Sequence, residues 1–408
     1  MIGFVLADLR RLWVGGLFVV VLIALATALG AAVILQERAL RLGSARAADA
    51  FDLVIGASGS ETQLVLSTVF LQPAPLPLLP GAVLSRLAAD PRVAFAAPVG
   101  FGDFYGDHPI IGTTNALATF GGRFPLAEGR GFERLDDAVA GARSGLALGD
   151  TVHPMHGHAE EGGHGHEAVA YRVVGRMAPT GTPWDRAILV PIEAVWAVHR
   201  PGAGNWPTTP GAASHGRIDL SGPVGMADAE NPGVPAILVK PKTIAEAYRL
   251  RGEYRTGPTL AVFPGEVLTR LYATLGDART VLAIVAYGAQ ALVGAAIALV
   301  AVLHVAQRRR QIGALRAMGA PRLAVFGIVW CELLALVGAG ILAGLALGYG
   351  AARLISGGLE RSGGFSLPVA YQSADAGFVA ALLAGAALIA AVPALLAYRL
   401  PPAEALRV

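Results

Sequence analysis

Five histidines and three glutamates crowd a glycine-rich stretch near the middle of the chain. The histidines, which include two H-x-H pairs, are His153, His156, His158, His164 and His166. Imidazole nitrogens and carboxylate oxygens are ligands that zinc and copper take in proteins. The stretch therefore predicts a zinc or copper site. The alternative is a solvated loop between two strands that binds nothing, because ordering a flexible loop costs conformational entropy.

A second unusual stretch, QRRRQIGALRAMGAPRL, runs from Gln307 to Leu323. Three arginines end an apolar run, three apolar residues follow at helical spacing, and a Gly-Ala-Pro sequence breaks the chain before the next apolar run. An arginine-rich amphipathic segment between two membrane helices is expected at the cytoplasmic surface. The residues with which it would contact a partner are Arg308, Arg309, Arg310, Ile312, Leu315, Arg316 and Met318. The alternative is that they only orient the spans and rest in the bilayer interface.

The composition indicates a membrane protein. Of the 408 residues, 54% are hydrophobic and only 15% are charged, which is too apolar for an ordinary soluble protein. The formal charge is +3, but the arginines gather at the ends of apolar runs. Membrane orientation explains them better than a nucleic-acid partner does. The one cysteine, Cys331, excludes an internal disulfide framework.

Four apolar runs are long enough to cross a bilayer, which takes roughly 20 residues. They are Leu12–Leu35, Asp277–Val305, Leu323–Leu354 and Ala376–Tyr398. The first is too long for the apolar core of a cleaved signal peptide, so a retained span is expected. The flanking arginines predict that both termini are cytoplasmic and that the region between the first two spans is outside.

The outer region predicts two β-α-β units that bracket a β-rich insert. The fold class is therefore an α+β membrane protein with four transmembrane helices, one plus three, and a large extracytoplasmic α/β domain carrying an inserted β-rich subdomain. The expected parts are a lead-in and first span (1–35), the first α/β part (36–118), the insert with the His-rich loop (119–233), the second α/β part (234–277), and three spans with a coupling segment at 307–323 (278–408).

Lysine occurs only at positions 240 and 242, and neither lies in a G-x-x-x-x-G-K-[ST] context. The chain therefore has no phosphate loop of the Walker type, and any ATP it uses must be bound by another polypeptide.

Two polar residues lie inside the expected spans. Glu332 is costly there, by about 2.5–3.5 kcal/mol on insertion scales, so it is expected to face the helix bundle or the inner interface. Pairing with an arginine is favoured over a proton relay. Gln290 is expected to make a helix–helix hydrogen bond rather than bind substrate. In the outer region, Trp184 lies in a Pro/Gly turn and is either a partner-binding tip or folded onto its own subdomain.

The segment Arg308–Arg322, Glu332, the Gly/Ala/Leu-rich run to Gly350 and the tail Tyr398–Arg407 resemble the FtsX-type permease signature. With the one-plus-three spans, the chain resembles MacB- and LolC/LolE-like ABC transporter permeases. MacB itself carries an ATPase domain that is not found here, so the resemblance is to the split arrangement.

The resemblance implies a non-catalytic subunit in the bacterial inner membrane. It would pair with a second permease copy, identical or paralogous, and with a cytoplasmic ABC ATPase dimer that holds Mg-ATP. ATP-driven motion would reach the outer domain and serve export or extraction of a lipoprotein, peptide or drug-like substrate, with an extracytoplasmic or lipoprotein partner. The alternative function is an envelope protein that handles or senses metal through the His-rich loop.

Overall fold

The computed structural model describes residues 13–156 except 73, 164–165, 169–199, 232–274 and 317–399 except 374, and the separate residues 220, 222, 224, 280, 281, 284, 288, 291, 294, 295, 298, 302 and 314. The chain divides into two compact units. We call Met1–Leu40, Leu275–Gly358 and Pro368–Val408 the membrane unit, and Arg41–Thr274 with Leu359–Leu367 the sheet unit.

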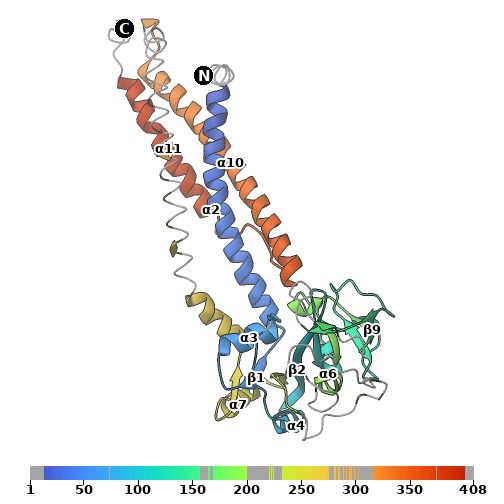
Figure 1. Cartoon of the computed structure of the whole chain (residues 1–408). Helices are drawn as coiled ribbons and strands as arrows, with labels where there is room; N and C mark the ends of the chain where they lie inside the picture. The colour runs from blue at the N-terminus through green and yellow to red at the C-terminus, as the bar shows by residue number, and fades with distance from the viewer. Residues whose placement is uncertain are drawn as a thin grey trace. The chain divides into compact units, whose positions relative to one another are not determined.

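In the described part of the chain, three helices are long and apolar enough to cross a membrane. They are α2 (Trp13–Ala48), α10 (Arg322–Gly363) and α11 (Asp375–Arg399), which run alongside one another (Figure 1). The described residues between 280 and 302, inside the predicted second span, are helical. The other residues of that span lie outside the described part. The predicted fold class, an α/β domain joined to apolar spans, is confirmed.

Two of these helices are longer than their apolar runs. α2 continues past Leu35 to Ala48, and α10 continues past Leu354 to Gly363. The extension of α2, QERALRLGSARAA, is rich in alanine, arginine and leucine, which favour helix even where the sequence becomes polar. Hydropathy therefore marks where the lipid-facing part ends and does not mark where the helix ends.

The sheet unit is built on a 12-stranded sheet with β12-β1-β11-β2-β3-β10-β5-β9-β4 as its main path. The strands are β1 (Leu53–Ala57), β2 (Val93–Tyr105), β3 (His108–Thr113), β4 (Leu126–Gly129), β5 (Asp137–Ala140), β6 (Thr151–Val152), β7 (Met155–His156), β8 (His164–Gly165), β9 (Tyr171–Met177), β10 (Ile188–Pro191), β11 (Ala236–Pro241) and β12 (Thr259–Val262). The helices are α3 (Glu61–Val69), α4 (Gly81–Ala89), α5 (Asn115–Ala118), α6 (Ile192–His199), α7 (Ile244–Glu253) and the 3-10 turn η2 (Pro183–Arg186).

The two predicted β-α-β units are interleaved. β11 lies between β1 and β2, β1 lies between β11 and β12, and all three neighbouring pairs are antiparallel. This is the split β-α-β arrangement. Thr243 caps α7, because its side chain accepts a hydrogen bond from the Glu246 amide. Each unit thus completes the other's sheet, although the first ends with β2 at Tyr105 and the second begins with β11 at Ala236.

β2 joins this part of the sheet to the remaining strands. Its first half pairs with β11, and its second half pairs with β3 and β7. Farther along, β10 lies parallel to β3, and β5 lies parallel to β9. The structure groups all of Arg41–Thr274 in one unit. The division of the outer region at residues 119 and 233 therefore stays a prediction.

The turn before β10 folds into the core of the sheet unit. Trp184 is fully buried, packs against Phe51 and Phe120, and its indole Nε1 donates a 3.1 Å hydrogen bond to the Thr68 carbonyl. The buried Asp185 carboxylate accepts hydrogen bonds from the amides of Thr180 and Gly181 and so fixes the turn. The interpretation of Trp184 as a partner-binding tip is wrong, and its alternative is confirmed.

The substitution Trp184→Phe should destabilise the sheet unit by about 1–3 kcal/mol, because it leaves the buried Thr68 carbonyl without its donor. Urea unfolding followed by circular dichroism measures the change. Leu78→Ala, at a side chain that is 59% exposed, is the control and should change stability little. Equal effects of the two substitutions would contradict the assigned role of the indole.

Candidate functional site in the membrane unit

The helices α2 and α10 approach closely along a row of glycines. Gly340, Gly344 and Gly348 recur every four residues on α10, which is one face of a helix. A Cβ atom at Gly340 would lie 2.7 Å from Ile23 Cβ, and one at Gly344 would lie 2.6 Å from Thr27 Cβ. At Gly348 it would lie 2.7 Å from a backbone oxygen of α2. Such small residues allow backbones to pack directly in lipid.

One end of the membrane unit is joined where α10 begins and α11 ends. The Arg322 guanidinium lies 6.0 Å from the centroid of the Tyr398 ring. About two helical turns further along α10, the Trp330 indole donates a 3.0 Å hydrogen bond to the Ala387 carbonyl of α11. An indole N–H within a span needs an acceptor, so this bond fixes the facing surfaces of α10 and α11.

The other end is joined by polar contacts of α2. The Arg38 guanidinium donates two hydrogen bonds, of 2.7 and 2.6 Å, to the two carboxylate oxygens of Asp375 at the start of α11. The two side chains are only 12% and 14% exposed. Nearby in sequence on α2, the Gln36 side chain accepts a 3.2 Å hydrogen bond from Ser356 of α10. A bidentate arginine–carboxylate pair is among the stronger and more directional hydrogen-bonded contacts.

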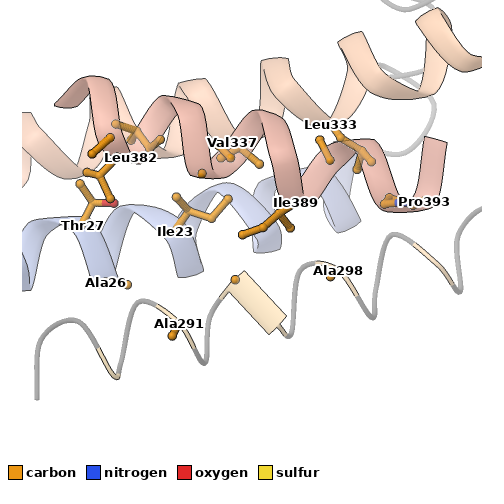
Figure 2. Close-up of a pocket in the computed structure, with 16 residues that line it drawn as sticks. Ile23, Ala26, Thr27, Ala291, Ala298, Leu333, Val337, Leu382, Ile389 and Pro393 are labelled. Atoms are coloured by element: carbon orange, nitrogen blue, oxygen red, sulfur yellow. The ribbon is translucent and has the colours of Figure 1, made fainter. Parts of the chain in front are cut away.

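Between the two ends, the helices line an open apolar pocket of about 280 Å³ (Figure 2). Its wall is formed by α2, α10, α11 and the described part of the second predicted span. The labelled lining residues are Ile23, Ala26, Thr27, Ala291, Ala298, Leu333, Val337, Leu382, Ile389 and Pro393. Except for the Thr27 hydroxyl, these side chains offer only hydrocarbon. The pocket suits an apolar chain and carries no group for acid–base chemistry.

Of the two polar residues predicted to lie inside the membrane, Glu332 is described and Gln290 is not. Glu332 lies on α10 and is only 7% exposed. Its neighbour Leu333 lines the pocket. Gln290 lies outside the described residues.

The arginine-rich segment is described only at its end. Ala314 and Ala317 are helical, and the Met318 amide donates a 3.0 Å hydrogen bond to the Ala314 carbonyl. Gly319 follows with φ = +97°, a backbone conformation that glycine adopts without strain. The Met318 side chain is 78% exposed. The other predicted contact residues of this segment, Arg308, Arg309, Arg310, Ile312, Leu315 and Arg316, lie outside the described part.

The predicted metal ligands belong to the sheet unit. His153 is exposed, and its Nδ1 lies 3.1 Å from the Val169 carbonyl. His156 and His164 lie in β7 and β8, where the structure describes the backbone alone. His158 and His166 lie outside the described part. Among the side chains that are described, no group of three or more His, Cys, Asp or Glu residues could hold a metal.

Long apolar helices packed through glycines, a buried carboxylate in one of them and an apolar pocket define a multi-span integral membrane protein. Residues 283–402 match the model of the FtsX-like permease C-terminal domain. The C-terminal part of the chain therefore carries an FtsX-like permease domain, and the resemblance seen in the sequence is confirmed.

No curated protein sequence matches the chain. Among solved structures, the periplasmic region of MacB from Actinobacillus actinomycetemcomitans matches with a TM-score of 0.32 and 10% identity. The match covers 55% of this chain and 95% of that one. A TM-score this low does not establish a shared fold or function.

Several contacts of the membrane unit were not expected from the sequence. The G-x-x-x-G-x-x-x-G pattern from Gly340 to Gly348 was a usable signal, because this spacing marks close helix packing. The Arg38–Asp375 pair had none, since its members lie 337 residues apart.

Replacing Gly344 by valine should destabilise the membrane unit by about 1–3 kcal/mol, because the added side chain must displace the α2 backbone. The matched control is Gly350→Val on the same helix, where a Cβ meets no atom within 4 Å. Thermal melting of the purified chain in detergent compares them. If the two variants melt together, close α2–α10 packing is not what holds the unit.

Arg38→Gln and Asp375→Asn should each lower the melting temperature, and the double variant should fall little further. Each single change removes the same half-buried ion pair and leaves one charge uncompensated. The coupling in this cycle is expected to be about 1–2 kcal/mol. Fully additive effects would show that the pair contributes nothing.

Proposed function

We propose that the chain is the permease subunit of an ABC transporter and that a separate cytoplasmic polypeptide supplies its ATPase activity. The match of residues 283–402 to the FtsX-like permease domain carries the proposal. That match includes the arginine-rich segment 307–323, and the 408 residues contain no Walker-type phosphate loop. Binding and hydrolysis of Mg-ATP then belong to the partner.

The arginine-rich segment is the part that the ATPase would push. At the described end, Met318 is 78% exposed and is followed by the φ-positive Gly319 and by Pro321, which begins the turn into α10. A large, unbranched and exposed side chain in a turn after helical residues suits insertion into a groove of a partner. The adjoining Arg308, Arg309, Arg310 and Arg316 would supply charge to the same contact and to lipid headgroups.

Motion would leave the membrane through continuous helices. α2 and α10 each begin in the membrane unit and end in residues of the sheet unit, at Ala48 and Gly363. A helix resists bending over this length, so displacement at one end is carried along its backbone. In this proposal the ATPase moves the arginine-rich segment, the segment moves α10, and α10 moves the sheet unit.

The proposed setting is the bacterial inner membrane, with both termini in the cytoplasm and the sheet unit outside. Arginines at the ends of the apolar runs support this orientation. The working complex would contain a second permease copy, either this chain or a paralogue, and two ATPase subunits. The cargo class is a lipoprotein, peptide or drug-like molecule handled outside the membrane.

Affinity purification of the tagged chain in mild detergent tests the proposal directly. An ABC ATPase should co-purify, and ATP hydrolysis by that ATPase should change on addition of the chain. Met318→Asp and Arg316→Glu should each weaken this association at least tenfold, because they place a negative charge in the contact. The control is Ile244→Asp, at an equally exposed apolar residue (79%) of the sheet unit, which should bind normally.

Loss of association in the Ile244 variant alone would point to the sheet unit as the docking surface. Retained association and stimulation in both segment variants would refute the role given to residues 307–323.

A further inference from the structure

Three strands at the side of the main sheet place three residues of metal-ligating type in one row. β7 pairs antiparallel with β2 on one side and with β8 on the other. Asp103 of β2 is the register partner of His156, and His156 is the register partner of His164. Residues directly opposite each other in adjacent antiparallel strands share a face and have Cβ atoms about 4.5–5.5 Å apart. The row Asp103, His156, His164 therefore lies on one face of a three-stranded ribbon.

The Asp103 position is on the protected face of the sheet. Its residue is 4% exposed, and its partner on β3, Ile110, is 2% exposed. A carboxylate in such a buried position is screened less by water, which strengthens its attraction for a cation.

Two imidazoles and one carboxylate form a donor set that borderline divalent metals accept. A strand ladder also answers the main objection to a metal site in a flexible loop. The backbone of each ligand is held by paired strands, so less conformational entropy is lost when the metal binds. Water or another histidine of the stretch could complete a four-coordinate site.

We propose that Asp103, His156 and His164 form a binding site for a divalent transition metal, for which Zn²⁺ is the probe. Of the five histidines in the His-rich stretch, this site uses His156 and His164. It adds the carboxylate of Asp103, some 50 residues earlier in the chain. It goes beyond the proposed transport function and does not depend on it. Binding would fix the β7–β8 hairpin to β2 and release the protons that the two imidazoles carry at lower pH.

Calorimetric titration of the full-length chain in detergent with Zn²⁺ tests the site. Asp103→Asn keeps the size of the side chain and removes its charge, and it should weaken binding at least tenfold. His156→Ala and His164→Ala should each weaken it by a similar or larger factor. Substitution of Asp103 in the His164→Ala background should cost little more, because both residues serve one metal.

The matched control is His108→Ala. His108 belongs to β3 in the same sheet, and its Nδ1 lies 3.0 Å from the Arg186 carbonyl. This variant should bind Zn²⁺ like the unmodified chain. Co²⁺ in place of Zn²⁺ should give visible absorption bands that disappear in the Asp103→Asn variant.

Melting curves separate a lost site from a lost fold. Zn²⁺ should raise the melting temperature of the unmodified chain and of the His108 variant, and should leave that of Asp103→Asn unchanged. The proposal is overturned if the chain binds no Zn²⁺. It is also overturned if the Asp103→Asn variant binds Zn²⁺ normally while a combined His158→Ala and His166→Ala variant does not bind it. The metal would then be held by the His-rich loop and not by the row of paired strands.

Discussion

The close approach of α2 to α10 is the constraint on which the membrane unit depends. Lipid is as apolar as leucine, so helices in a bilayer gain little from burying hydrocarbon against each other. They must gain contact area and polar bonds, and both require the backbones to lie close. Glycines 340, 344 and 348 provide this approach. The Arg38–Asp375 and Trp330–Ala387 bonds can form only when α11 lies beside the pair that the glycines set.

The sheet unit solves a different problem by a different means. Water drives its folding, and its core is filled by large side chains such as Trp184, whose single polar atom is satisfied by the Thr68 carbonyl. Its two β-α-β units, early and late in the chain, complete one sheet between them. The intervening strands are attached through β2, which changes partners along its length. Pairing between distant strands therefore holds this unit together, whereas close packing between distant helices holds the other.

Sequence reasoning succeeded where a local signal had one interpretation. α11 matches its apolar run to within a residue at each end, because the run is uninterrupted and bounded by polar residues. Sequence reasoning left two interpretations where the signal was ambiguous: Trp184 stands in a turn that has no periodicity. The partner of His156 on β2 could not be found at all, since register between distant strands is set by the whole sheet.

The arginine-rich segment and the histidine cluster belong to different parts of the chain. The segment lies inside the region that matches the FtsX-like permease domain, and in the proposed function it is the contact for the ATPase. β7 and β8 lie off the main path of the sheet, and among the described residues β7 pairs with β2 through two residue pairs. A metal bound by Asp103, His156 and His164 would add a second link between these strands and β2. In the two proposals, the contact with the ATPase and the metal row belong to different units of the chain, so either one can be changed without changing the other.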